Sequence, residues 1–427
     1  MILTVTLNVA LDVTYQVDAL VPGAAHRVRT VVERPGGKGL NVARVLHALG
    51  EPVIATGLIG GAAGVRARDL LETKHAFVEI AGESRRTVVV SDGSDATGFW
   101  EPGPLVTAEE WAEFVARYRG LVAVARVVVL SGSLPRGVPV DAYAELVTIA
   151  RERGVPTILD TSGEPLTRAL AAGPDVIKPN AEELSEAIRG TALAAGAVTA
   201  QAGAETAAQA GAETAQVGAG GLPRHGAEAG AAAHGVSSPA SNTARGNNPG
   251  TDGSGTGPAD GAHAGVPATD GPGADGGART TTTGPGPTAG NHAVHGDPDR
   301  DRPTQADGDG DRIATAGLAH IVECAEALRK AGARAVLASR GPDGMLAVTA
   351  DGRWLAAPPA PVAGNPTGAG DSAVAAVARG LAYQKEWSSI LTDAVALSAS
   401  AVLAPEAGAF DSIAYRAFRR AVTPQEL

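Results

Sequence analysis

Cysteine and positive charge are both scarce in this chain of 427 residues. The single cysteine, Cys324, excludes an intrachain disulfide and is typical of a protein kept in a reducing compartment. The formal net charge of −11 argues against nucleic acid or an anionic membrane as the main partner. No segment approaches the ~18 unbroken apolar residues of a membrane span, and residues 1–7 lack the basic start of a signal peptide. The sequence therefore predicts a soluble cytoplasmic protein.

Residues 191–312 lack Phe, Trp, Tyr, Met and Lys, and they consist mainly of Ala, Gly, Thr, Pro, Asp and Ser. Such a composition cannot bury enough apolar surface to offset the entropy lost on ordering, so we expect a disordered insertion. The repeat Q-A-G-A-E-T-A, at 201–207 and 209–215, is far shorter than the ~20–50-residue period of a repeat fold. The insertion separates two flanks, 1–190 and 313–427, which together have the size of one α/β domain.

In these flanks, apolar runs typical of strands alternate with helical patterns. This alternation, with strands that are apolar throughout, predicts an α/β fold with a parallel sheet covered by helices on both faces. The predicted strands are Ile2–Leu7, Val53–Thr56, Val127–Leu130, Thr157–Leu159, Val176–Lys178 and Ala335–Ala338. The predicted helices are Asn41–Leu49, Glu109–Arg119, Val140–Arg153, Ala181–Arg189, Gly317–Ala331 and Ser372–Arg379.

Two regions, about 13–32 and 87–100, follow a different pattern. Polar and apolar residues alternate there, which is typical of half-exposed antiparallel strands. We expect a small sheet that closes over a site as a lid, and that could pair with another copy of the chain. The predicted lid strands are Val13–Val17, His26–Val32, Thr87–Ser91 and Thr97–Trp100.

The stretch Asn365–Gly380 combines a tight glycine turn with the start of an apolar helix. Backbone N–H groups at a helix start have no intrahelical partner and carry the positive end of the macrodipole. Glycines allow a ligand to approach this backbone closely. With Asp371 in the first turn, the stretch offers an anion hole beside a carboxylate, which is the pairing that phosphoryl transfer needs. The alternative is an ordinary helix with an N-terminal aspartate.

Polar residues follow several other predicted strands. In Pro35–Asn41, P-G-G-K-G-L-N, a glycine turn carries Lys38, which could hold hydroxyls and a phosphate or could be a solvated surface residue. It is not a Walker A loop, because Gly39 stands where Ser or Thr is required. Asp12 is expected just beyond the first strand, where α/β sites gather, and its alternative is a simple turn aspartate. The turn S-G-S-L-P begins at Ser131 and follows another strand.

Two further turns have the same position at strand ends. In K-P-N-A-E-E, Asn180 and Glu183 match a binding motif, but they also match the two partners of a helix capping box. The turn S-R-G-P-D-G, residues 339–344, suits a nucleotide phosphate or a simple chain reversal.

The order and spacing of these motifs resemble the PfkB (ribokinase-like) carbohydrate kinases. The set is G-G-K-G-x-N, S-G-S-L-P, K-P-N-x-x-E, S-x-G-x-x-G and N-P-x-G-A-G-D, and it spans both flanks while skipping the insertion. The opening I-L-T-V-T-L-N, the run G-G-K-G-L-N-V-A-R-V-L and S-G-S-L-P are most similar to the 1-phosphofructokinase and tagatose-6-phosphate kinase branch. G-G-K-G-x-N alone does not discriminate, since ribokinases carry it too.

The resemblance implies roles for residues on the sugar side. Asp371 matches the base that takes the proton from the sugar hydroxyl, and an ordinary aspartate pKa of ~3.9 would leave it ionised at pH 7. Arg85 matches the phosphate-binding arginine of the sugar-phosphate kinases, and Arg27 is expected to assist it. The implied anion hole is Gly368, Ala369 and Gly370, and the other sugar-side candidates are Asp12, Gly37, Lys38, Asn41 and Ser131.

The resemblance also implies an ATP and Mg²⁺ side. Asn180 and Glu183 match the motif associated with magnesium and the donor phosphates, and Lys178 is expected to assist. The nucleotide turn is implied to hold Ser339, Gly341 and Gly344.

Two departures from the family pattern affect these expectations. Val9 replaces the usual proline before the residues that lead to Asp12, which would shift that loop. Arg340 replaces the usual leucine of the nucleotide turn, which would alter binding of the donor.

The implied reaction is ATP-dependent phosphorylation of a ketohexose phosphate, fructose 1-phosphate, fructose 6-phosphate or tagatose 6-phosphate, to the bisphosphate. One alternative is a kinase of an unphosphorylated sugar or nucleoside. Another is a catalytically inactive sensor of sugar phosphates, although a sensor has no need of Asp371. Because loop closure becomes only slowly more costly with length, the insertion should be dispensable for catalysis.

Overall fold

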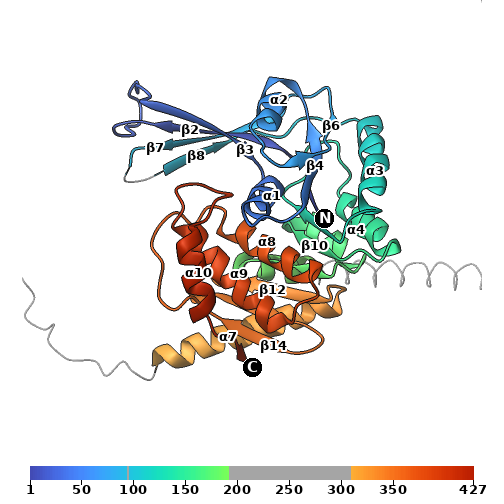
Figure 1. Ribbon diagram of the computed structural model, residues 1–427, viewed down its shortest axis with the longest axis vertical. Helices are drawn as coiled ribbons and strands as arrows, with labels where there is room; N and C mark the ends of the chain where they lie inside the picture. The colour runs from blue at the N-terminus through green and yellow to red at the C-terminus, as the bar shows by residue number, and fades with distance from the viewer. Residues whose placement is uncertain (94–95, 192–308) are drawn as a thin grey trace, which may run out of the picture. The chain divides into compact units, whose positions relative to one another are not determined.

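An 11-stranded, mostly parallel sheet forms the centre of the fold (Figure 1). The structure, a computed structural model, describes residues 1–93, 96–191 and 309–427, and within the last range the side chains from Gly317 onward. From one edge to the other, the strands are β15 (Gln425–Glu426), β14 (Arg353–Ala356), β13 (Met345–Val348), β12 (Ala335–Ser339), β11 (Val176–Ile177), β10 (Thr157–Asp160), β9 (Val127–Ser131), β1 (Ile2–Thr6), β4 (Val53–Ile59) and β5 (Lys74–His75), and β6 (Val78–Glu79) pairs with β4.

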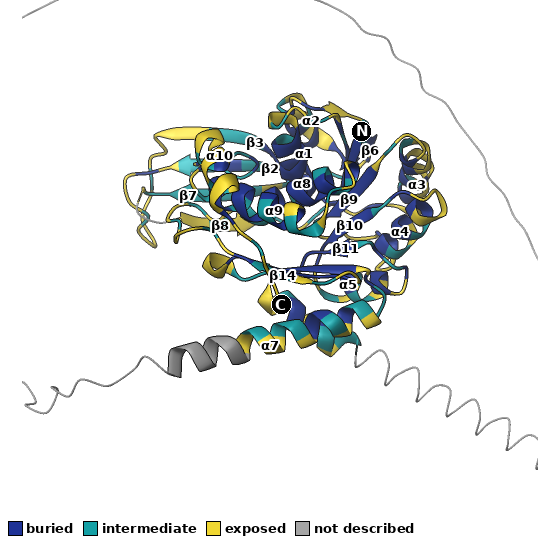
Figure 2. Cartoon of the chain, turned by 60° about the horizontal axis from the view of Figure 1, so that its bottom comes forward, coloured by how far each residue is buried: buried dark blue, intermediate teal, exposed yellow. Residues whose placement is uncertain are grey.

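Helices cover both faces of this sheet, as the sequence predicts. Successive residues of a strand face opposite sides, so Val127 and Val129 of β9 belong to one buried cluster and Val128 and Leu130 to the other. Figure 2 shows the central strands as buried between the helices. The first cluster is completed by α1 (Lys38–Ala48), α2 (Gly61–Asp69), α8 (Ala369–Ala382), α9 (Trp387–Val402) and α10 (Ser412–Ala421). The second is completed by α3 (Ala108–Val122), α4 (Ala142–Glu152), α5 (Gly163–Leu170), helical residues 181–191 and α7 (Asp309–Lys330).

The structure confirms the predicted parallel sheet in its centre, but the parallel order ends at β12, which the sequence did not predict. β12, β13, β14 and β15 pair in antiparallel fashion. The reason is the short connection after β12, a 3-10 turn at Gly341–Asp343, because a parallel pair needs a crossover of a dozen or more residues. The elements α2, α5, α9, α10, β5, β6, β13, β14 and β15 were not predicted.

The predicted lid is a separate four-stranded sheet (Figure 1). Its strands, in spatial order, are β3 (Thr30–Gly36), β2 (Ala10–Gln16), β7 (Arg85–Ser91) and β8 (Ala96–Trp100). β3 and β8 pair with their neighbours in antiparallel fashion, as predicted, but β2 and β7 pair in parallel. The chain between β2 and β7 contains β3, α1, β4, α2, β5 and β6, which is long enough for a parallel connection.

The predicted disordered insertion, 191–312, lies outside the described residues except for its ends. Thr191 is helical, and α7 begins at Asp309, eight residues before the predicted start of that helix. All described residues belong to one compact unit, Met1–Glu213 with Gln305–Leu427, and a second unit, Thr214–Thr304, lies outside them. Among the described helices, none has the length and apolar character needed to cross a membrane.

Candidate active site

A cavity of about 1290 Å³ lies where the carboxyl ends of the central strands meet the lid. Thr6, Asp160 and Lys178 line it from the ends of β1, β10 and β11, and Asp12 and Trp100 line it from the lid. This edge of an open α/β sheet is where ligands bind, because the loops that leave parallel strands converge there. Most motifs that the sequence analysis singles out come together here.

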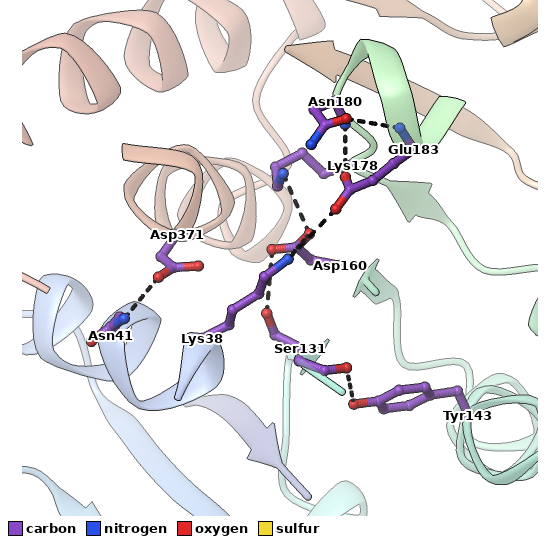
Figure 3. A network of polar contacts seen from close by, with 10 residues as sticks. Lys38, Asn41, Ser131, Tyr143, Asp160, Lys178, Asn180, Glu183 and Asp371 are labelled. Atoms are coloured by element: carbon purple, nitrogen blue, oxygen red, sulfur yellow. Dashed lines mark hydrogen bonds and ion pairs between the residues drawn. The ribbon is translucent and has the colours of Figure 1, made fainter. Parts of the chain in front are cut away.

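Asp371 lies in the first turn of α8 and is only 7% exposed. Asn41 of α1 donates a hydrogen bond from Nδ2 to Asp371 Oδ2 at 2.8 Å (Figure 3). The preceding Gly368 adopts φ 84°, and a Cβ there would lie 2.8 Å from Ala407 Cα, so the turn requires glycine. Gly368 and Gly370 line the cavity, whereas the N–H of Ala369 donates to Pro366 O at 3.2 Å and is engaged in the turn itself.

Burial raises the pKa of Asp371 to about 6, which corrects the expectation of an ordinary aspartate. The negative charge of Asp160 raises this pKa further, while the hydrogen bond from Asn41 and the charges of Lys38 and Lys178 lower it. The ordinary aspartate pKa applies to a carboxyl group that water hydrates. The sequence does not show that the fold removes this hydration from Asp371. The carboxylate is therefore a stronger base than expected, and it is still mostly ionised at neutral pH.

Asp160 is the residue at the centre of the site that the sequence analysis missed. Its side chain is 1% exposed, and its Oδ1 lies 3.3 Å from both Lys38 Nζ and Lys178 Nζ (Figure 3). Burial acts to raise the pKa of Asp160, but the two ammonium groups outweigh it and hold the pKa below its usual value. One signal in the sequence could have identified it. Asp160 directly follows the predicted strand Thr157–Leu159, just as Ser131 directly follows the predicted strand Val127–Leu130.

Ser131 supports the site from behind the cavity wall. It is fully buried, and its hydroxyl donates to Asp160 Oδ2 at 3.4 Å. The next residues, Gly132 and Ser133, line the cavity instead. Tyr143 donates to Gly132 O at 2.9 Å and fixes this turn (Figure 3).

Asn180 and Glu183 form a capping box at the start of helical residues 181–191. The N–H of Asn180 donates to Glu183 Oε2, and the N–H of Glu183 donates to Asn180 Oδ1, both at 2.8 Å. This geometry matches the structural alternative raised from the sequence. The other oxygen of Glu183, Oε1, lies 4.0 Å from Lys38 Nζ (Figure 3). Within the described part of the chain, no group of three or more His, Cys, Asp or Glu is arranged to hold a metal ion.

The turn after β12 lies beside this capping box. The N–H of Ser339 donates to Pro179 O at 3.1 Å, and Asn180 and Ser339 form an isolated β-bridge. Gly344 has φ 84°, and a Cβ there would lie 2.0 Å from Ala356 O, so close approach of β14 explains this glycine. Ser339, Gly341 and Gly344 are not among the residues that line the 1290 Å³ cavity.

Asp12 lies within lid strand β2 and not at the end of β1, which corrects the prediction. The chain turns at Leu7 and Asn8, so a new strand begins at Ala10. Burial raises the pKa of Asp12, although Thr87, Arg85 and Arg44 act against that rise. A Cβ on Gly36 would lie 2.1 Å from Asp12 Oδ1, so the first glycine of the G-G-K-G turn makes room for this carboxylate.

Three arginines line the cavity: Arg34, Arg44 and Arg85. Arg85 Nε donates to Asn8 O at 3.4 Å, and burial lowers its pKa. Arg27 is exposed and does not line the cavity, so the structure does not bring this predicted helper to the site. Arg34 and Arg44, which the sequence analysis missed, form ion pairs with Glu406.

A family model described as pfkB family carbohydrate kinase matches residues 5–220 and 310–413. The chain belongs to the pfkB family of carbohydrate kinases. Among curated proteins it is similar to tagatose-6-phosphate kinase of Staphylococcus epidermidis, with 42% identity over 191 residues. That match covers 44% of this chain and 62% of the relative, which is less than two thirds of the relative's length.

Solved structures show the same fold. Phosphofructokinase-2 from Escherichia coli in complex with potassium matches with a TM-score of 0.65 and 21% identity, over 99% of this chain and 98% of that one. A possible 1-phosphofructokinase from Thermotoga maritima matches with a TM-score of 0.62 and 21% identity, over 100% and 99%. A ribokinase from Arabidopsis thaliana, complexed with ribose and ATP, has a TM-score of 0.55 and 15% identity, over 98% of each chain. These likenesses confirm the ribokinase-like fold.

Two residues distinguish this member of the pfkB family from the pattern it resembles. Val9 is 2% exposed and belongs to the first buried cluster. Arg340 folds back on its own turn, where its Nη1 donates to Asp343 O at 3.5 Å.

We expect Asp160→Asn to lower the free energy of unfolding by about 3 kcal/mol, because it removes the carboxylate charge that pairs with the buried ammonium of Lys178. Chemical denaturation at pH 7 measures this loss. The matched control is Glu164→Gln, which breaks an exposed ion pair with Arg168 and should cost less than about 1 kcal/mol. Equal losses in the two variants would contradict a central role for Asp160.

Proposed function

We propose that this protein transfers the γ-phosphoryl group of ATP to a hydroxyl of a phosphorylated ketohexose and forms the bisphosphate. The acceptors considered are fructose 1-phosphate, fructose 6-phosphate and tagatose 6-phosphate. The observation that carries the proposal is the position of Asp371, a buried carboxylate at a glycine-turn helix start, in one cavity with two lysines and Arg85.

Asp371 is the proposed base. Its pKa of about 6 leaves it ionised at pH 7, and it is basic enough to accept the proton as the hydroxyl attacks. The hydrogen bond from Asn41 holds one carboxylate oxygen, so the other is the one that faces the acceptor. The N–H groups at the start of α8, next to Asp371, supply positive charge where the phosphoryl group moves.

Lys178 is the proposed contact for the donor phosphates, and Lys38, which the resemblance assigns to the sugar side, is held by the same carboxylate and would contact them too. Asp160 holds both ammonium groups at one place, so that neither has to be ordered when ATP binds. A bound Mg²⁺ would neutralise charge on the donor phosphates. Magnesium is held by one or two carboxylates together with substrate phosphates and water. Glu183 fits this pattern, because its Oε1 is outside the capping hydrogen bonds, and Glu183 with Asn180 would hold the ion.

Arg85 supports a phosphorylated acceptor. It lies on the lid side of the cavity, away from the lysines in sequence and fold, and burial lowers its pKa, so an anionic partner would offset the cost of its charge. The names of the relatives, tagatose-6-phosphate kinase and phosphofructokinase-2, point to the same class of acceptor. The alternatives remain a kinase of an unphosphorylated sugar or nucleoside, and an inactive sugar-phosphate sensor.

We expect the lid sheets of two copies to pair into a homodimer. Apolar side chains of the lid are exposed, with Val31 at 55%, Phe99 at 56% and Trp100 at 71%. Val31 and Phe99 lie on the lid face away from the cavity and Trp100 on the cavity face, and exposed apolar side chains of this kind are typical of an interaction surface. Sedimentation equilibrium should give twice the chain mass, and Phe99→Asp should reduce it. A monomer at all concentrations of the parent protein would contradict this expectation.

The deciding assay is ADP release from ATP and Mg²⁺ with the three ketohexose phosphates, fructose, ribose and adenosine. We expect turnover only with a phosphorylated ketose.

Arg85→Ala should then lower kcat/KM by about 10- to 100-fold, because a charge-assisted hydrogen bond is lost. Arg86→Ala is the matched control, since its exposed side chain pairs with Glu101 and does not line the cavity. Turnover only with an unphosphorylated acceptor would favour a kinase of an unphosphorylated sugar or nucleoside. ATP binding without ADP release for any acceptor would favour the inactive sugar-phosphate sensor.

Asp371→Asn should lower kcat by about 10²- to 10⁴-fold, the usual contribution of a general base. In the parent protein, kcat/KM should fall as pH decreases below about 6, because Asp371 becomes protonated. The same variant should be more stable at pH 7 by up to about 3 kcal/mol, since the pKa of Asp371 is about 6 in the fold against an ordinary 3.8.

The stability difference has a definite dependence on pH. The unfolded carboxyl ionises at lower pH than the folded one, so the parent protein loses stability relative to Asp371→Asn as pH rises from about 4 to about 6. Urea denaturation of both proteins at pH 4.5 and pH 7.5 measures this change. An active Asp371→Asn variant would exclude Asp371 as the base.

A further inference from the structure

An ion-pair cluster in the wall of the 1290 Å³ cavity joins three segments that lie far apart in the chain. Its members are Arg34 of lid strand β3, Arg44 of α1 and Glu406 of the loop 403–411, which connects α9 to α10. All three side chains are partly buried, with 38%, 19% and 25% of their surface exposed. The reaction proposed above assigns no role to any of them.

The carboxylate of Glu406 lies between two positive charges. It forms an ion pair with Arg34 Nε and another with Arg44 Nη2, the latter at 3.9 Å. Burial lowers the pKa of Arg44, and the charge of Arg34 lowers it further, so the two guanidinium groups are close enough to repel each other. Glu406 offsets this repulsion and connects the lid strand to α1.

The loop that carries Glu406 packs directly against the glycine turn at the start of α8. Arg44 Nη1 donates to Ala407 O at 2.7 Å and holds the loop backbone in this position. A Cβ on Gly368 would lie 2.8 Å from Ala407 Cα and 3.2 Å from Gly408 N, so no side chain separates the loop from the turn.

Asn365 attaches the turn to the same loop by hydrogen bonds. Its N–H donates to Val402 O at 2.8 Å, and its Nδ2 donates to Pro405 O at 3.3 Å. Its Oδ1 accepts from the N–H of Thr367 at 3.0 Å. The position of the loop therefore determines the position of the turn, and the turn leads into the N–H groups that are proposed to stabilise the moving phosphoryl group.

A second ion pair of the same lid strand provides a comparison. Glu33 directly precedes Arg34 in β3, so the two side chains face opposite sides of the lid. Glu33 Oε2 pairs with Arg66 Nε of α2 at 2.7 Å. This pair also holds β3 to the body of the protein, but neither of its residues lines the 1290 Å³ cavity.

We propose that Glu406 is a positioning residue through which the lid sets the glycine turn for phosphoryl transfer. Arg34 fixes Glu406 relative to the lid, and Arg44 fixes the same loop relative to α1. The proposal rests on the kinase function proposed above. Arg85, the proposed contact of the acceptor phosphate, belongs to the same lid sheet, so an acceptor that holds the lid in place also holds the turn where the phosphoryl group moves.

The first measurement is amide hydrogen exchange of residues 364–372, which requires no substrate. Arg34→Gln and Glu406→Gln should each raise the exchange rate of this segment by about three- to tenfold, a typical effect of breaking one contact between coupled residues. In the double variant the rate should rise no further, because both changes break the same link. Additive effects would overturn the proposal.

Arg66→Gln is the matched control, because it breaks the other ion pair of β3. We expect residues 364–372 of this variant to exchange at the rate of the parent protein. The same rise in Arg66→Gln would show a general loosening of the lid and would overturn the proposal, as would an unchanged rate in Arg34→Gln.

The second measurement uses the acceptor that the parent protein phosphorylates. In Arg34→Gln, Glu406→Gln and the double variant, kcat should fall by about three- to tenfold, with the Kd of ATP unchanged. If Arg34 instead contacted the acceptor directly, the loss in the double variant would be the product of the two single losses, which would contradict the link. Absence of ADP release from the parent protein, with the expected exchange pattern, would contradict the kinase function and leave the link between lid and turn in place.

Discussion

The site depends on one buried carboxylate, that of Asp160, and on the two ammonium groups that it holds. Lys38 comes from the first turn of α1 and Lys178 from the end of β11, so the contact joins segments that lie far apart in the chain. Because β9, β10 and β11 are parallel neighbours, their carboxyl ends lie at one edge of the sheet. Asp160, at the end of β10, therefore lies between the ends of β9 and β11. Two lysines so close to each other would repel without this charge.

The same carboxylate affects the chemistry of Asp371. Burial is the main reason that the pKa of Asp371 is raised, and the charge of Asp160 adds to it, while Lys38 and Lys178 oppose it. Asp160 therefore has two effects: it holds the two ammonium groups at one place, and its charge raises the pKa of Asp371, the proposed base. An aspartate surrounded by the two lysines alone would have a lower pKa and would accept a proton less readily.

Much of the fold could be predicted because each element is apolar in a local pattern. Strands β1, β9 and β10 are buried on both faces, and continuous apolar runs such as Val127–Leu130 indicate such burial directly in the sequence. The antiparallel edge at β12 to β15 could not be read in this way, because strand direction depends on how the chain returns. Asp12 was misplaced for a similar reason: the sequence predicts a lid strand from Val13, but not that this strand begins at Ala10 and contains Asp12.

By itself, the sequence determined the α/β class, the glycine turn before Asp371 and the capping box of Asn180 and Glu183, because these depend on residues close together in the chain. Only the tertiary structure decided which separate residues meet. It placed Arg34 and Arg44 in the cavity and left Arg27 exposed, it put Asp160 between the lysines, and it joined Arg34 of the lid to Glu406. Burial, long-range distance and hydrogen-bond satisfaction are properties of the packed chain, and no local pattern contains them.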